Sequence, residues 1–231
     1  MSSTIQYRTN YKGNSSDETD LATFTKMVCA GKQSLFEHTG DADEVQNIYA
    51  DVDVLFTGSD WEVMEEDDED TGRPNYESLE ASILAFVAES VAKISADQLL
   101  FRTCRNHRVV EKGNHGHDDT VKFSYRLFCY SHCATKPNQK KLAQHLNQEW
   151  LGHKCSKMDG FEELFDMSVY DKSRKMRCVN TAKPEEVPAV KMAPCDGSFE
   201  NIDQTFIQRH KFYPTPLFES RIFADDYVPA V

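Results

Sequence analysis

Apolar residues alternate or recur at helical spacing along most of the chain, and these patterns predict strands and helices in turn. Residues 46–56 (QNIYADVDVLF) are rich in β-branched and aromatic side chains and predict a strand. Apolar residues three and four apart predict an amphipathic helix over 76–96. The composition then predicts a short strand over 98–104 and a longer one over 120–130.

The second half of the chain continues the alternation and then becomes irregular. A second helix is expected to begin at Pro137-Asn138, with Asn138 as its cap, and to reach Trp150. Residues 161–170 and 176–179 are expected to form a hairpin whose turn is 171–174. From Pro184 onward, prolines predict irregular structure with one short helix. Strands and helices in this order predict an α+β (mixed α/β) sheet fold.

Composition favours an intracellular globular protein, nuclear or cytoplasmic. The 231 residues allow one large domain or two closely packed modules. The chain has no apolar run long enough to span a membrane and no signal-peptide pattern, and its seven scattered cysteines favour reduced thiols. The net charge of −12 argues against a uniformly basic nucleic-acid-binding surface, although eight acids lie within the segment 60–74, which is expected to be an exposed loop.

The candidate chemistry begins with Asp51 and Asp53, two acids inside the apolar strand 46–56. Side chains two residues apart in a strand share a face, so the two carboxylates converge. A divalent cation relieves the repulsion between converging carboxylates, and Mg²⁺ or Mn²⁺ prefers such oxygen ligands. Asp166, in another apolar run, would complete a three-carboxylate site for two ions. The alternative is that these acids face water.

Basic residues gather near the same acids in the sequence. Lys122, Ser124 and Arg126 alternate along the strand 120–130 and therefore share a face, where they suit a triphosphate. A second group of bases follows Asp166: Arg174, Arg177 and Lys183 are its members of interest. The alternative is a solvated strand face with no ligand.

Three segments together resemble the motifs of the archaeo-eukaryotic primase superfamily, in the same order. Asp51-Val52-Asp53 is similar to its D-x-D motif, and Lys122-Phe123-Ser124-Tyr125-Arg126 resembles its K-x-S-x-H motif with arginine in place of histidine. The segment from Asp166 to Arg177, followed by Lys183, resembles its third motif. The resemblance covers roughly residues 34–208 and is closest to the primase-polymerase and large-DNA-virus branch.

This resemblance implies a single catalytic core over 1–231, in which an N-terminal α/β module and an RRM-like module face a shared cleft. The implied function is template-directed nucleotidyl transfer by a DNA primase or primase-polymerase. Asp51, Asp53 and Asp166 would hold two Mg²⁺ or Mn²⁺ ions. The nucleoside triphosphate would be bound by the basic and hydroxyl residues Lys122, Ser124, Arg126, Arg174, Arg177 and Lys183. A single-stranded DNA template and a replicative helicase, on the same or another chain, would be partners.

Three other hypotheses remain open at the level of sequence. The chain could be a non-catalytic nucleic-acid-binding or replisome-interaction module on a primase-like fold, or a metal-dependent nuclease built on the same acids. Zinc ligands could come from Cys129, His132, Cys133, His153 and Cys155, or from Cys104, His107, His115 and His117. Neither set has the paired spacing of common structural zinc sites, so buried thiols and loop histidines are favoured.

Overall fold

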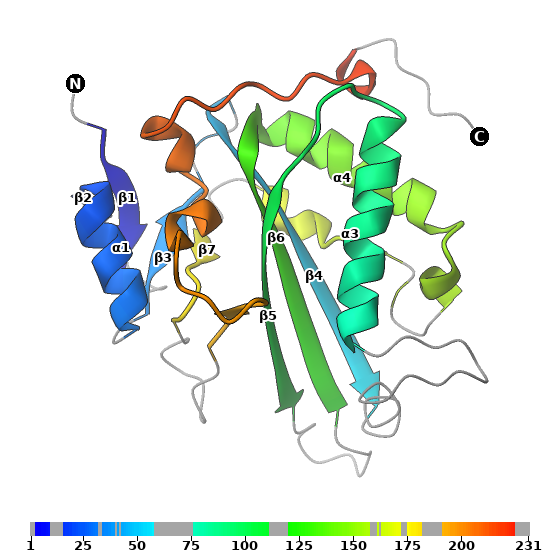
Figure 1. Cartoon of the computed structure of the whole chain (residues 1–231), viewed down its shortest axis with the longest axis horizontal. Helices are drawn as coiled ribbons and strands as arrows, with labels where there is room; N and C mark the ends of the chain where they lie inside the picture. Colours follow the sequence, from blue (N-terminus) through cyan, green and yellow to red (C-terminus); the bar gives the residue numbers. More distant parts are fainter. Residues whose placement is uncertain are drawn as a thin grey trace.

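In the part of the chain that the structure describes, a computed structural model shows two antiparallel four-stranded sheets and three α-helices (Figure 1). The structure describes residues 3–9, 16–31, 34–39, 41, 43–57, 76–110, 120–157, 161, 163–171, 175–181 and 191–224. The expected α+β class is confirmed. The expected acidic loop 60–74 lies outside the described residues. Among the helices of the described part, none is both long and apolar enough to span a membrane.

The larger sheet has the strand order β4-β6-β5-β8. Its strands are β4 (Val45–Thr57), β6 (Thr120–Thr135), β5 (Phe101–Val110) and the short β8 (Ala193–Pro194). Helix α3 (Tyr76–Ala92) connects β4 to β5, and α4 (Lys136–Trp150) follows β6. Both helices cover the same apolar face, because Ile48 and Leu127 of the sheet line one small internal cavity with Val87 of α3 and Leu142 of α4.

The smaller sheet has the order β2-β1-β3-β7 and gathers strands from both ends of the chain. It contains β2 (Asp17–Thr19), β1 (Ile5–Arg8), β3 (Phe36–His38) and β7 (Lys175–Arg177). Helix α1 (Leu21–Ala30) lies beside β1 in Figure 1, and its Phe24 ring packs 5.3 Å from that of Tyr7. Asp20 caps the start of α1, and Gly31 ends it with a φ of 58°.

The C-terminal segment joins the two sheets through short 3₁₀-helices, η3 (Ile202–Thr205), η4 (Arg209–Lys211) and η5 (Arg221–Phe223). The Phe206 ring lies 5.0 Å from Phe24 of α1, while the Asn47 N–H of β4 donates to the Ile207 carbonyl over 2.9 Å. On the side of the smaller sheet, the buried Glu37 carboxylate of β3 accepts hydrogen bonds from the backbone N–H groups of Ile207 and Gln208. This segment therefore contacts both sheets.

Most of the elements expected from the sequence are present, with shifted ends. The strand expected over 98–104 begins at Phe101 and continues to Val110, and the helix expected near Asn138 begins at Lys136, with Thr135 as its N-cap. The short helix expected after Pro184 corresponds to three 3₁₀-helices.

The expected hairpin of 161–170 with 176–179 is wrong. The 3₁₀-helix η2 (Met167–Tyr170) replaces its first strand, because the Asp166 side chain accepts a hydrogen bond from Ser168 N–H and caps a turn there. Its second strand, β7, pairs instead with β3 of the smaller sheet. Arg177 therefore lies on a strand of the smaller sheet and not on a hairpin with the Asp166 segment.

Candidate active site

The two acids of the D-x-D motif lie on the middle of β4, opposite the polar residues of β6. The antiparallel register pairs Asp51 with Arg126 and Asp53 with Ser124. Cross-strand partners project to the same face, so both acids and the alternating polar side chains of β6 share one surface. The opposite face of these strands is apolar and packs under α3 and α4. The register confirms the prediction that Asp51 and Asp53 share one face of their strand, as Lys122, Ser124 and Arg126 do of theirs.

Asp51 and Arg126 form a buried ion pair. The Arg126 Nε donates to Asp51 Oδ1 over 3.0 Å, and the two side chains are 11% and 7% exposed, respectively. Burial raises the pKa of Asp51, the Arg126 charge opposes that rise, and the neighbouring charges of Asp53 and Asp166 add to it. Burial lowers the pKa of Arg126, but the charge and hydrogen bond of Asp51 together with the charge of Asp53 oppose it and leave that pKa raised. Arg126 therefore compensates the charge of the deeper acid.

Asp53 lies closer to solvent, with its side chain 29% exposed. The Lys122 ammonium donates to its Oδ2 over 2.8 Å, and the Ser124 hydroxyl donates to its Oδ1. Partial burial raises the pKa of Asp53, but the hydrogen bonds from Lys122 and Ser124 outweigh it and leave the pKa lowered. Asp53 is therefore an ionised carboxylate beside an accessible lysine.

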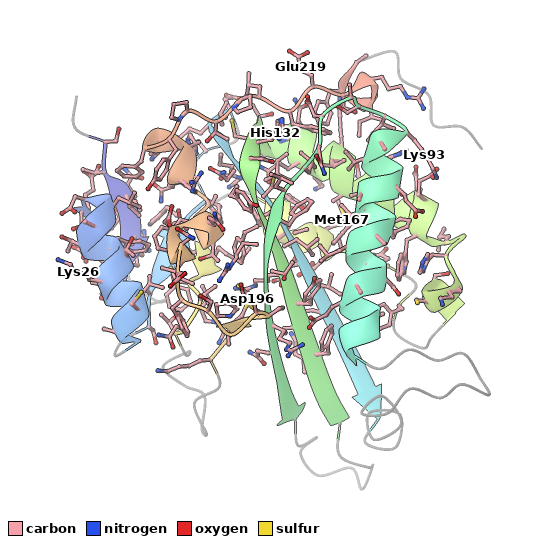
Figure 2. The ribbon with its side chains drawn as sticks, in the orientation of Figure 1. Lys26, Lys93, His132, Met167, Asp196 and Glu219 are labelled. Atoms are coloured by element: carbon pink, nitrogen blue, oxygen red, sulfur yellow. The ribbon has the colours of Figure 1, made fainter. Side chains whose placement is uncertain are left out.

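Asp166 reaches the site through its main chain. Its backbone N–H donates to the carbonyl oxygen of Asp51 over 2.8 Å, and its charge contributes to the raised pKa of Asp51. Both oxygens of the Asp166 carboxylate accept from Ser168, over 2.8 Å from the backbone N–H and 3.0 Å from the hydroxyl. Met167, labelled in Figure 2, is the next residue along this segment. The structure thus places the third acid beside the first.

Two tyrosines hold the segment of Asp166 against β4. The Tyr170 hydroxyl donates to the Tyr49 carbonyl over 2.7 Å, while the Tyr49 hydroxyl donates to the Val169 carbonyl over 2.9 Å. Both side chains are buried, and their rings lie 5.5 Å apart. Hydrogen bonds between buried groups fix position, because leaving a buried carbonyl unpaired is costly. This reciprocal contact was not predicted from the sequence.

Arg177 joins the site from the smaller sheet. The Arg126 Nη1 donates to the Arg177 carbonyl over 2.8 Å, so the same guanidinium contacts β4 and β7. The Arg177 side chain is itself buried. The other two residues that the sequence assigned to triphosphate binding after Asp166, Arg174 and Lys183, lie outside the described residues.

Asn106 of β5 is a site residue that sequence reasoning missed. The register pairs it with Ser124 of β6, so its side chain lies on the face of the two acids. It is 8% exposed, and its Oδ1 has no hydrogen-bond partner. Buried acceptors are nearly always paired in folded proteins, so an unpaired one beside charged groups is typical of a ligand-binding position. The sequence signal was weak, because Asn106 stands in a strand with polar neighbours on both sides.

Whether a divalent cation fits this site depends on which side-chain atoms are placed to bind it. The carboxylates of Asp51 and Asp53 supply hard oxygen ligands on one strand face, which suits Mg²⁺ or Mn²⁺. Within the described residues, no group of three or more acidic, histidine or cysteine side chains is close enough to hold a metal ion. The described residues thus offer the Asp51–Asp53 pair as oxygen ligands, while Asp166 is held beside the pair through its main chain and its carboxylate accepts from Ser168.

The cysteines of the alternative zinc sets are buried thiols. Cys104, Cys129, Cys133 and Cys155 are at most 3% exposed, and burial raises the pKa of each. Of the histidines in those sets, His115 and His117 lie outside the described residues, as does the side chain of His107. His153 stacks on Trp150 with ring centroids 4.4 Å apart.

Comparison with known proteins adds no identification. No protein-family model matches the sequence, and no curated protein matches it. The functional argument therefore depends on the residues and their geometry.

Proposed function

We propose that the chain is the catalytic core of a DNA primase or primase-polymerase that carries out template-directed nucleotidyl transfer. The observation that carries this proposal is the convergence of three segments far apart in sequence. Asp51 and Asp53 on β4 face Ser124 and Arg126 on β6, and the Asp166 N–H donates to the Asp51 carbonyl. The three segments are those that resemble the superfamily's motifs.

The arrangement of the larger sheet supports the same proposal. The order β4-α3-β5-β6-α4 along the chain, with β6 between β4 and β5 in the sheet, is a split β-α-β unit with both helices on one face. An RRM-like module has this connectivity, and the proposed family pairs such a module with an N-terminal one. The smaller sheet, which contributes the Arg177 carbonyl to the site, would be that second module.

In this proposal, Asp51, Asp53 and Asp166 would hold two Mg²⁺ or Mn²⁺ ions. Bound ions of this kind activate an attacking hydroxyl and neutralise a pyrophosphate leaving group. The chain's own residues orient the substrate. Lys122, with its side chain 28% exposed, offers an accessible charge to the triphosphate.

The more deeply buried basic residues have other roles. Arg126 is engaged with the Asp51 carboxylate and the Arg177 carbonyl, so it positions the acid rather than binding substrate. Among the remaining residues proposed for the triphosphate, Ser124 and Arg177 belong to the described site. Arg174 and Lys183 stay in the proposal on the resemblance alone.

A second candidate is a non-catalytic nucleic-acid-binding or replisome-interaction module. The ion pairs favour it, because Arg126 and Lys122 already compensate both acids of β4 without any further cation. Such a network can be purely structural. The two candidates differ in whether Asp53 takes part in chemistry.

The deciding experiment is nucleotide incorporation on a single-stranded template in the presence of Mn²⁺. The variant Asp53→Asn keeps the shape of the side chain and should lower incorporation at least about 100-fold. Asp17→Asn, at an exposed position of β2, is the matched control and should retain activity. Unchanged incorporation by D53N, or no incorporation by the wild type, would reject the enzymatic proposal. Cleavage of labelled DNA without nucleotides would instead indicate a nuclease.

A further inference from the structure

A row of basic side chains crosses one face of the smaller sheet. The register pairs Arg8 with Phe36, Phe36 with Arg177, and His38 with Lys175. Partners across strands share a face, as do residues two apart on one strand, so Arg8, His38, Lys175 and Arg177 all project to the same side. We call these four residues the basic row. A hydrogen bond of 3.0 Å from Arg8 Nε to His38 Nε2 confirms the shared face.

The opposite face of this sheet is covered. Tyr7 and Glu37 project to that side, where the Tyr7 ring packs on Phe24 of α1 and the Glu37 carboxylate accepts from the N–H groups of Ile207 and Gln208. The sheet therefore has one face packed against the body and another that presents the basic row. On the latter face Arg8, His38 and Lys175 are half-buried, and Arg177 is buried.

The positive charges of this region act on one another. Burial is the main cause that lowers the pKa of His38, and the charges of Arg8, Lys175, Lys136 and Lys211 lower it further. Burial likewise lowers the pKa of Lys175, and the Arg8 charge adds to that decrease. Of these four bases, Lys136 is buried and faces Asp41 and Glu44, and Lys211 donates to Gln208. A local concentration of positive charge of this kind attracts phosphate groups.

The basic row leads directly to the candidate active site. Its last member, Arg177, is the residue whose carbonyl accepts from Arg126, which in turn contacts Asp51. From β1 to β7 the row crosses two strand spacings, or about 10 Å. The two half-buried cations of the row, Arg8 and Lys175, can each pair with one phosphate of a strand that crosses it.

We propose that the basic row, through Arg8 and Lys175, binds the phosphodiester backbone of a single nucleic-acid strand and directs it to Asp51 and Asp53, while Arg177 at its end stays assigned to the triphosphate. This inference rests on the proposed function and names the surface its template would use. A strand fits better than a free triphosphate, because Lys122 and Ser124 beside Asp53 already provide for the triphosphate. The net charge of −12 makes such a local basic surface necessary for binding nucleic acid.

The test is the salt dependence of binding to labelled oligothymidylate, measured by fluorescence anisotropy in EDTA so that no chemistry occurs. Each phosphate contact contributes about 0.7 to the slope of log affinity against log salt for a single strand. The double variant Arg8→Gln/Lys175→Gln should lower that slope by about 1.4. Lys175→Gln alone should lower it by about 0.7 and serves if the double variant does not fold.

The matched control removes the same number of charges elsewhere. Lys26→Gln/Lys93→Gln alters an exposed lysine of α1 and another that directly follows α3, both labelled in Figure 2. Its slope should equal that of the wild type. A wild-type slope in the Arg8/Lys175 variants, or an equal decrease in the control, would overturn the inference. The inference would also be overturned if the Arg8/Lys175 variants lost affinity for thymidine triphosphate while their affinity for the oligonucleotide stayed unchanged.

The outcomes also separate this inference from the proposed function. If the wild type incorporates nucleotides but the Arg8/Lys175 variants keep the wild-type slope, the surface is wrong and the function stands. If the slope falls as expected but the wild type incorporates nothing, the surface stands and the chain is a binding module.

Discussion

The backbone N–H of Asp166 donates to the carbonyl oxygen of Asp51, so two acids from distant parts of the chain are joined through their main chains. This contact does not depend on either carboxylate. The acidic side chains can therefore be replaced while the segments that carry them stay together. Asp51 is the less suitable position for such a replacement, because its loss leaves the buried guanidinium of Arg126 unpaired.

Asp166→Asn should separate chemistry from structure. The amide oxygen of asparagine can still accept the Ser168 N–H, so the free energy of unfolding should change by less than about 1 kcal/mol. Nucleotide incorporation should fall at least about 100-fold if the carboxylate charge is required. Thermal unfolding and template-directed incorporation measure the two effects. Ser168→Ala keeps the acid and should remain active; equal losses in both variants would point to a structural role.

Arg126→Met should destabilise the protein strongly. The variant leaves the buried Asp51 carboxylate without its ion-pair partner, which costs about 3 kcal/mol. The double variant Asp51→Asn/Arg126→Met should recover part of this loss, since it buries no unpaired charge. Urea unfolding of the single and double variants provides the double-mutant cycle. Stability equal to the wild type in the single variant would show that the pair contributes little.

Glu37 should give the protein a pH-dependent stability. Burial raises the pKa of Glu37 from 4.5 to about 7, while the two backbone N–H groups and the charge of Lys211 limit the rise. The folded chain therefore binds a proton more tightly than the unfolded chain does. The stability that Glu37 contributes is complete below pH 4.5 and is lost as the pH rises through about 7, by up to about 3 kcal/mol.

Other groups titrate in the same range, so a variant is needed to isolate Glu37. Cys178 lies near the Glu37 carboxylate, but burial raises the pKa of its thiol well above the usual value, so this thiol stays protonated over the range and the competing groups are histidines. Burial lowers the pKa of His38, His145, His153 and His210, so their contribution to stability is lost as the pH falls. The difference in unfolding free energy between wild type and Glu37→Gln should thus decrease from pH 5 to pH 8. Glu200→Gln, at an exposed position, should show no such trend.

Asn106→Leu should stabilise the protein and weaken nucleotide binding. The unpaired Oδ1 of Asn106 is buried, and replacing it with an apolar group of similar size should raise the free energy of unfolding by about 1 kcal/mol. If that oxygen accepts a hydrogen bond from the nucleotide, affinity should fall about three- to tenfold. Calorimetric unfolding and nucleotide titration check the two parts. A gain in stability with unchanged affinity would remove Asn106 from the site.

Sequence patterns predicted the larger sheet well, because its strands are long and its helices amphipathic. Strands β4 and β6 carry enough β-branched and aromatic residues to be recognised, and the alternation of Asp51 and Asp53 fixed their shared face. The pairing of Asp51 with Arg126 could not be predicted, since register depends on which strands meet.

The smaller sheet was largely missed, for a physical reason. Strands of three residues, such as β3 and β7, are too short to show any periodicity and exist only through long-range pairing. The run from Phe161 to Tyr170 was misassigned, because its apolar composition suits a strand while Asp166 caps a turn and Tyr170 bonds to the main chain of Tyr49. Local hydrogen bonds overrode the composition there.

At the candidate site the Arg126 guanidinium of the larger sheet donates to a main-chain oxygen of the smaller sheet, the carbonyl of Arg177. Every amino acid has such a carbonyl, so position 177 can exchange its side chain while Arg126 still finds its acceptor. Natural or engineered variants at position 177 can therefore change substrate preference while this contact between the two sheets is retained.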